Sequence, residues 1–186
     1  MIGESLTGAT RAEFPAMLGR LGYVYGAEVG VEQGQNAARI LTGWRGRLLL
    51  VDCWAQQPLA VYCDQAAYWS DADQEANYQK TLAAMAPFGG RATVRRMMSA
   101  EAAGQLADGE LDFVYLDANH EYSAVLAELA LWYPKVRRGG MISGHDFLDA
   151  GRPFGVASAV REFVRELPVA LEVAPEDWAN WHFVKP

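Results

Sequence analysis

Apolar segments with the spacing of strands alternate with segments that have the spacing of helices along most of the chain. Strand-like runs occupy residues 23–29, 47–51, 92–97, 111–116 and 141–144. Helical spacing of apolar residues is found within residues 35–41, 78–85, 125–136 and 156–167. Strands and helices in alternation are typical of a parallel α/β sheet with helices on both faces.

The C-terminal part of the chain departs from this alternation. Two strand-like segments, Val169–Val173 and Trp181–Val184, follow one another with too few residues between them for a helix. Because parallel neighbours need a long crossover, these two strands are expected to form an antiparallel hairpin. We therefore expect a Rossmann-like sheet of seven strands, mostly parallel, with the last strand reversed.

One helix is expected to be long and to end at a pair of glycines. Val125, Leu129, Trp132 and Val136 step by four, three and four residues, as on one face of a helix. Gly139-Gly140 is expected to supply the left-handed turn out of this helix.

The length of the chain, 186 residues, is typical of one domain, which we expect over residues 1–186. Residues 1–22 would form an N-terminal segment and residues 54–74 a long insertion. The insertion is rich in aromatic residues, namely Trp54, Tyr62, Tyr68 and Trp69. A connection of this length inside a domain is typical of a lid, although a satellite hydrophobic cluster is an equal alternative.

Charge and composition exclude several classes of protein. The formal net charge of −7 and the lack of extended Lys/Arg clusters argue against nucleic-acid binding. No apolar run approaches the roughly 20 residues that span a bilayer, and the N-terminus does not resemble a signal peptide. Cys53 and Cys63 have neither CxxC nor metal-ligand spacing. A cytoplasmic protein with two free thiols is expected.

The turn after the first long strand carries two glycines and two acids. Gly30 and Gly34 let the backbone turn sharply at the start of a helix and approach a ligand there. Their spacing is not the GxGxxG of dinucleotide folds, and Glu28 and Glu32 would repel a pyrophosphate. Asp52 ends the next strand, where a carboxylate can bind ribose hydroxyls. A cationic nucleoside-type cofactor therefore fits better, the alternative being that the two glycines only make a tight turn and that Asp52 is a capping residue.

Two later strands end in acids and histidines. Asp117 and His120 follow the strand that starts at Leu111, and His145 and Asp146 follow the next one. Because ligands bind outside the carboxyl ends of parallel strands, these four side chains are expected to meet in a site. This convergence indicates an enzyme. The third histidine, His182, lies between two aromatic residues of the last strand and is expected to be structural.

These segments together resemble a known family. EVGVEQG at 28–34, Asp52, DFVYLDANHEY at 112–122 and GGMISGHDF at 139–147 resemble class I S-adenosylmethionine-dependent methyltransferases. The likeness is greatest to small bacterial members related to antibiotic-sugar and cephalosporin-type O-methyltransferases, and it covers residues 23–184. By this resemblance S-adenosylmethionine is the cofactor. The resemblance places Glu28, Gly30, Gly34, Asp52, Trp54, Ser99 and Asp117 in its binding site, with Trp54 and Ser99 beside the adenine.

The resemblance also suggests a divalent cation, such as Mg²⁺, held by Asp117, His145 and Asp146. Imidazole is a poor magnesium ligand, so His145 is instead a candidate general base. His120 is the other candidate base, or else a helix-start residue. The sequence leaves open whether a metal is bound and which histidine is the base.

The expected function is methylation of a hydroxyl on a small-molecule acceptor, with no nucleic-acid or membrane partner. A non-catalytic cofactor-binding or scaffold protein of the same fold is the alternative. A nicotinamide dehydrogenase is disfavoured by Glu28 and Glu32. The acceptor and the formation of a homo-oligomer stay open.

Overall fold

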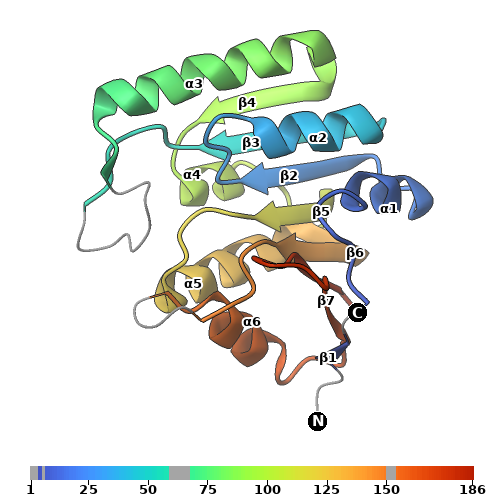
Figure 1. Cartoon of the computed structure of the whole chain (residues 1–186). Coiled ribbons are helices and arrows are strands. Elements are labelled where there is room, and N and C mark those ends of the chain that lie inside the picture. The colour runs from blue at the N-terminus through green and yellow to red at the C-terminus, as the bar shows by residue number, and fades with distance from the viewer. Residues whose placement is uncertain (1–3, 6, 59–67, 150–153) are drawn as a thin grey trace.

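In the computed structural model, residues 4–5, 7–58, 68–149 and 154–186 are described, and they contain one sheet of eight strands (Figure 1). The strands are β1 (Glu4–Ser5), β2 (Tyr25–Val29), β3 (Arg47–Asp52), β4 (Ala92–Arg96), β5 (Leu111–Leu116), β6 (Val136–Gly144), β7 (Leu171–Val173) and β8 (Trp181–Val184). Their order in the sheet is β1-β7-β8-β6-β5-β2-β3-β4. All neighbours are parallel except the two pairs made by β8. The mostly parallel sheet with a reversed last strand is confirmed, and β1 is an additional edge strand.

Helices cover both faces of the sheet (Figure 1). They are α1 (Phe14–Arg20), α2 (Gln35–Gly43), α3 (Asp71–Met85), α4 (Ser99–Gly104), α5 (Tyr122–Trp132) and α6 (Val156–Val164), with short 3-10 helices η2 (Ala86–Arg91) and η3 (Tyr133–Lys135). Residues of α1, α2 and α3 pack with Leu48 and Leu50 of β3, and residues of α4, α5 and α6 pack with Leu49 and Val51. Alternate residues of one strand thus enter two separate cores, which explains its continuous apolar sequence.

The predicted end of the long helix is wrong. Helix α5 ends at Trp132, the segment around Pro134 forms η3, and Val136 already belongs to β6. Proline lacks the N–H that an α-helix needs at this position, which the spacing of apolar residues does not reveal. Gly139 has the expected positive φ of 71°, but it lies within β6, where the pairing with β5 is irregular.

Two segments for which the sequence predicts no regular elements, residues 1–22 and 54–74, each contribute to a helix in the structure. Helix α1 forms within residues 1–22 and buries Phe14 and Leu18. In the expected insertion 54–74, helix α3 begins at Asp71, and its N-cap Ser70 forms a capping box with Asp73. Tyr62 and Cys63 lie outside the described residues. No helix in the described part of the chain is long and apolar enough to cross a membrane.

Candidate active site

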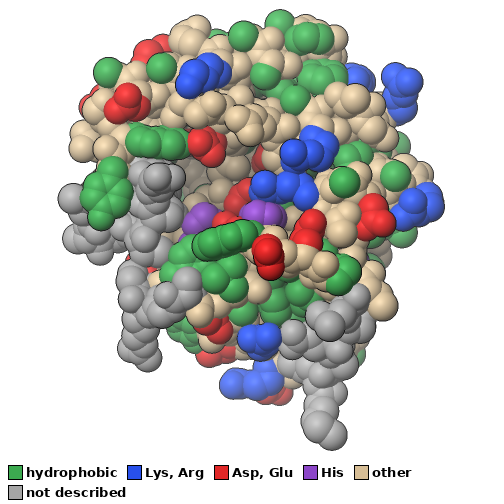
Figure 2. Space-filling view, viewed as in Figure 1, with side chains coloured by type: hydrophobic (Ala, Val, Ile, Leu, Met, Phe, Trp, Pro, Cys, Tyr) green, Lys and Arg blue, Asp and Glu red, His purple; other side chains and the backbone are tan. Residues whose placement is uncertain are grey.

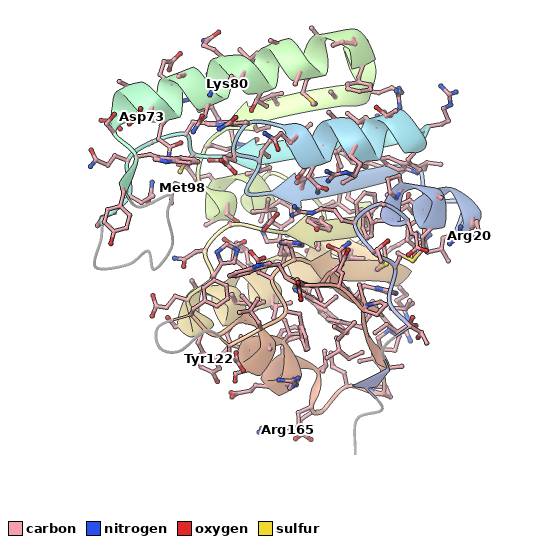
Figure 3. All side chains as sticks on the ribbon, viewed as in Figure 1. Arg20, Asp73, Lys80, Met98, Tyr122 and Arg165 are labelled. Carbon is pink, nitrogen blue, oxygen red and sulfur yellow. The ribbon has the colours of Figure 1, made fainter. Side chains whose placement is uncertain are left out.

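A cavity of about 420 Å³ lies at the carboxyl ends of β2, β3, β5 and β6. In the space-filling view, histidine side chains lie beside a hollow in this face, with charged side chains next to them (Figure 2). Eight predicted site residues line the cavity: Glu28, Gly30, Asp52, Ser99, Asp117, His120, His145 and Asp146. Met98, at the N-terminus of α4, also lines it and is half exposed (Figure 3).

The glycine turn lies directly against the neighbouring strand end. Gly30 has a φ of 85°, and a Cβ at this position would lie 2.1 Å from the backbone oxygen of Asp117. Asp52 holds the turn from the other side, since its Oδ2 accepts the N–H groups of Val31 (2.9 Å) and Glu32 (3.0 Å). Its Oδ1 accepts the N–H of Trp54 at 2.9 Å. Asp52 therefore shapes the turn and also borders the cavity.

Glu28 presents a buried carboxyl group to the cavity. It is 1% exposed, and its Oε1 accepts a hydrogen bond from Asn36 Nδ2 at 3.1 Å. Its Oε2 has no hydrogen-bond partner. Burial raises the pKa of Glu28 to about 8, an effect that the Asn36 hydrogen bond only partly offsets. A cationic ligand group would supply the missing partner.

The raised pKa of Glu28 predicts a loss of stability as pH rises from about 4.5 to 8. Between about pH 4.5 and 8 the folded protein keeps a proton that the unfolded chain has lost, so this group lowers the free energy of unfolding as pH rises. Glu28→Gln removes the titration and should be more stable than the wild type at pH 8, relative to pH 5, by roughly 2–4 kcal/mol. Urea unfolding of both proteins at the two pH values measures this difference. The same change in the free energy of unfolding between pH 5 and pH 8 in the wild type and in Glu28→Gln would contradict this prediction.

Two residues expected to bind the cofactor do not line the cavity. Trp54 is completely buried against Tyr78, with ring centroids 4.9 Å apart, and its Nε1 donates to the backbone oxygen of Glu32 at 2.7 Å. Gly34 is the N-cap of α2 and faces Thr81 of α3. Both residues instead fix α3 and the first turn relative to each other. Trp69, from the expected insertion, is an aromatic residue that does line the cavity.

Ser99, the other residue expected beside the adenine, does line the cavity. It links two side chains of α5, because its hydroxyl donates to Glu128 Oε2 at 2.7 Å and accepts from Trp132 Nε1 at 2.8 Å. Burial raises the pKa of Glu128, despite these neighbouring hydrogen bonds. Glu128 also lines the cavity, so the sequence missed one of its carboxyl groups.

Asp146 lies between the two candidate bases. Its Oδ2 is 2.9 Å from His120 Nε2 and its Oδ1 is 2.7 Å from His145 Nδ1. Burial alone would raise the pKa of Asp146, but hydrogen bonds with His120 and His145 outweigh it and hold the pKa well below its usual value. Asp146 is therefore ionised and positions both rings.

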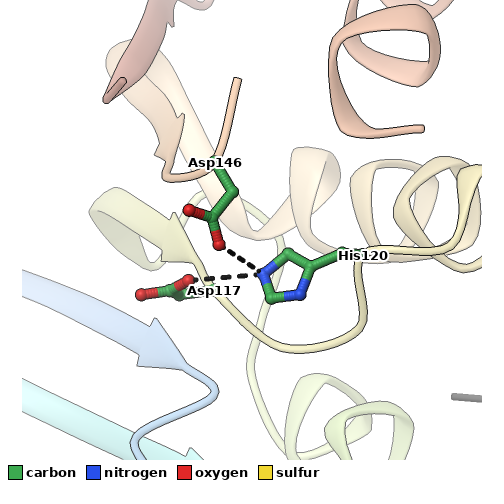
Figure 4. Close-up of side chains that lie close together, drawn as sticks. All are labelled: Asp117, His120 and Asp146. Carbon is green, nitrogen blue, oxygen red and sulfur yellow. Dashed lines mark ion pairs between the residues drawn. The ribbon is translucent and has the colours of Figure 1, made fainter. Parts of the chain in front are cut away.

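Asp117 completes the group from the end of β5. Its Oδ1 lies 3.6 Å from His120 Nε2, so the ring nitrogen faces two carboxylates (Figure 4). The ring of His120 also stacks on Phe154, with centroids 5.0 Å apart and planes inclined by 16°. His145 Nδ1 is 4.0 Å from Asp117 Oδ1 but 2.7 Å from Asp146 Oδ1, so His145 pairs with Asp146. Three side chains, Asp117, His120 and Asp146, place potential metal-ligand atoms within 4.8 Å of one another. The histidine of this group is His120, not the predicted His145.

Arg11 is a site residue that sequence reasoning missed. It comes from the segment before α1, and its Nη2 lies 2.8 Å from Asp117 Oδ2. Burial would lower the pKa of Arg11, but Tyr115 and Asp117 outweigh burial and raise it. No motif surrounds Arg11 in the sequence, so no local signal marks it.

The model of the family described as "Methyltransferase domain" matches residues 27–147, which is more than half of the chain. The chain belongs to this methyltransferase family. The matched region contains the glycine turn, Asp52 and the group around Asp146. A comparison with curated proteins finds no match.

Solved structures, among them those of methyltransferases, share the fold. An O-methyltransferase from Bacillus cereus in complex with SAH is 15% identical, has a TM-score of 0.62, and the alignment covers 94% of this chain and 80% of that one. An SAH-bound methyltransferase from Podospora anserina is 9% identical, with a TM-score of 0.65 and coverage of 92% and 76%. A protein from Corynebacterium glutamicum is 15% identical, with a TM-score of 0.68 and coverage of 96% and 82%. The class I, S-adenosylmethionine-dependent methyltransferase fold is thus confirmed.

The cavity of this methyltransferase fits S-adenosylmethionine. The cofactor carries a cationic sulfonium and an ammonium group, and the unpartnered Glu28 Oε2 is suited to a cation. Gly30 lines the cavity and lets the end of β5 pack directly against the first turn, because a Cβ there would lie 2.1 Å from the backbone oxygen of Asp117. The acidic first turn, which argued against a pyrophosphate, is compatible with this ligand.

Proposed function

We propose that this methyltransferase transfers the methyl group of S-adenosylmethionine to a hydroxyl group of a small molecule, with His145 as general base. The observation that carries this proposal is the 2.7 Å contact between His145 Nδ1 and the partly buried, ionised Asp146. Asp146 Oδ1 accepts a hydrogen bond from the Nδ1–H of His145, so that Nε2 carries the lone pair. This is the arrangement by which a carboxylate fixes the tautomer of a catalytic histidine.

Each of the residues around Asp146 has a separate role in the proposed reaction. When bound, the cofactor supplies an electrophilic methyl group on a sulfonium. His145 Nε2 takes the hydroxyl proton as the acceptor oxygen forms its bond to carbon and the carbon–sulfur bond breaks. Asp146 stabilises the imidazolium that results, and His120, facing Asp117 and Asp146, keeps the two carboxylates in place. The proton leaves His145 for solvent after product release.

The proposal is tested by incubating the protein with S-adenosylmethionine and a panel of small hydroxylated molecules. We expect S-adenosylhomocysteine to form together with an O-methylated product. A protein that binds S-adenosylhomocysteine but methylates no member of the panel would favour the alternative, a non-catalytic cofactor-binding protein of the same fold.

A second version of the site places a divalent cation between Asp117, His120 and Asp146, and the 4.8 Å grouping of their ligand atoms favours it. An imidazole with two carboxylates suits zinc, iron or manganese better than magnesium. Arg11, however, already pairs with Asp117 Oδ2 at 2.8 Å and supplies a positive charge there. We therefore give the histidine base priority over the metal.

The two versions differ in their response to a chelator. With His145 as base, turnover should stay within about twofold of its starting value after dialysis against EDTA, because none of the proposed steps uses a cation. Initial rates before and after dialysis, and after adding back Zn²⁺, Mn²⁺ or Mg²⁺, measure this response. Loss of turnover with recovery on one metal would assign the site to the metal version.

Asp52 is proposed to bind the ribose hydroxyls from the edge of the cavity. Asp52→Asn should weaken binding of S-adenosylhomocysteine by about 1–3 kcal/mol, because charged hydrogen bonds to the sugar are lost. Isothermal titration measures this loss, and Asp71→Asn, at an exposed acid on α3, serves as the control. Wild-type affinity in Asp52→Asn would limit Asp52 to its role in holding the turn.

A further inference from the structure

Arg11 is the only Lys or Arg among the described residues that line the cavity. The other ionisable groups there include six carboxyl groups, on Glu28, Glu32, Asp52, Asp117, Glu128 and Asp146. A single guanidinium in such a wall is the natural partner for a negatively charged part of a ligand, since every carboxylate around it would repel that part.

The backbone at Arg11 and before it is anchored. The Arg11 N–H donates to Glu176 Oε1 at 3.0 Å, and Asn180 Nδ2 donates to the backbone oxygen of Ala9 at 3.3 Å. The N–H of Gly8 donates to the backbone oxygen of Val173 at 3.0 Å. The segment before α1 is therefore fixed to β7 and to the loop between β7 and β8, and the guanidinium has a defined place in the cavity.

The guanidinium of Arg11 has hydrogen-bonding capacity that the protein does not use. Nη2 binds Asp117 and Tyr115 is a further hydrogen-bond partner of the side chain, whereas Nε is buried and has no hydrogen-bond partner. A buried donor without an acceptor is unfavourable, and a ligand oxygen would remove this cost. Adjacent guanidinium N–H groups match the two oxygens of a carboxylate, which makes a carboxylate the best-suited ligand group.

Two ligand carboxylates would come near this region, one on the cofactor and one on an acidic acceptor. The cofactor carboxylate has another place, because the N-terminus of α2 has no side-chain cap and its first residues, Gln35 and Asn36, line the cavity. Free N–H groups at a helix N-terminus bind anions. Arg11 instead contacts Asp117, which lies 4.0 Å from the proposed base His145.

We propose that Arg11 binds a carboxylate of the acceptor, and that the substrates are small hydroxy acids. This inference rests on the proposed function, because it assigns Arg11 to the acceptor of that reaction. Asp117 is near both residues, since its Oδ2 lies 2.8 Å from Arg11 Nη2 and its Oδ1 lies 4.0 Å from His145 Nδ1. The methylated hydroxyl is therefore expected to be a few bonds from the carboxylate.

The test compares two probes that have the same shape and differ in charge, salicylate and salicylamide. Their affinities for the protein loaded with S-adenosylhomocysteine are measured by titration calorimetry or ligand-observed NMR. Wild type should bind salicylate at least about 10-fold more tightly, Arg11→Gln should lose this preference, and Arg11→Lys should keep part of it. Arg165→Gln is the control, because Arg165 is exposed and lies away from the site (Figure 3).

Equal affinity of the wild type for the two probes would overturn the proposal, as would an unchanged preference in Arg11→Gln. A second arm compares S-adenosylmethionine with its decarboxylated form. If Arg11→Gln loses discrimination between these two instead, Arg11 serves the cofactor and the proposal is wrong. Methyl transfer to salicylate is measured separately. A salicylate preference that depends on Arg11, without O-methylated product from salicylate or from any member of the panel of hydroxylated molecules, would contradict the proposed function but not carboxylate binding by Arg11.

Discussion

Replacing His145 with alanine is expected to lower kcat by about 10²–10⁴, because the acceptor hydroxyl then loses its proton acceptor. Asp146→Asn should cause a loss of similar size. It leaves a neutral side chain that neither fixes the tautomer of His145 nor stabilises the imidazolium. Single-turnover rates at saturating S-adenosylmethionine measure the chemical step in both variants.

His120 supplies the matched comparison for this prediction. It contacts the same carboxylate, but its Nε2 faces Asp146 and Asp117 and not an open position. His120→Asn should therefore reduce kcat less than His145→Ala. S-adenosylhomocysteine should bind all three variants with wild-type affinity. Wild-type turnover in His145→Ala would exclude this histidine as the base, and a larger loss in His120→Asn would assign the role to His120.

The second large effect is expected at Gly30. Gly30→Ala places a Cβ 2.1 Å from the Asp117 backbone oxygen and 2.6 Å from the Cα of Ala118, at a φ of 85°. Both obstacles are backbone atoms, so neither a rotamer change nor a small shift relieves the clash. We expect a loss of about 3 kcal/mol in the free energy of unfolding, from strain and overpacking together. Urea unfolding measures the loss.

Gly104→Ala is the control for this substitution. Gly104 ends α4, and an added Cβ would meet no heavy atom within 4 Å. Alanine there should be neutral or stabilise the protein by up to about 1 kcal/mol. Gly30→Ala should also lose most of its affinity for S-adenosylhomocysteine, because β2 and β5 must move apart at the cofactor turn. Equal stability of the two variants would contradict the close packing of Gly30 against Asp117.

The parts of this fold that could be predicted are those with a strong local pattern. Strands β3 and β5 are continuous apolar runs, because each is buried on both faces, and the reversed β8 follows from the short connection after β7. Strand β1 has only two residues and carries no periodicity. The spacing of apolar residues does not give the end of α5, because Val136 fits the helical spacing equally well, whereas in the structure η3 around Pro134 ends the helix and Val136 pairs with Leu111 in β6.

The convergence of Asp117, His120, His145 and Asp146 could also be predicted, because adjacent parallel strands end at the same edge of a sheet. The sequence does not determine which ring nitrogen meets which carboxylate, because this depends on side-chain torsions. Arg11 is 106 residues from its partner Asp117, a distance over which single-sequence patterns contain no information. The direction of Trp54, away from the cavity, likewise follows from its packing against α3.

The central claim is that His145 activates a hydroxyl group for methyl transfer from S-adenosylmethionine. The most direct measurement follows the label from S-adenosylmethionine carrying a ¹³C-methyl group into a panel of small hydroxy acids by NMR. We predict labelled methyl groups bonded to oxygen in the wild type and the near-complete loss of this product in His145→Ala. Label on nitrogen or carbon, or equal product from both proteins, would contradict the account.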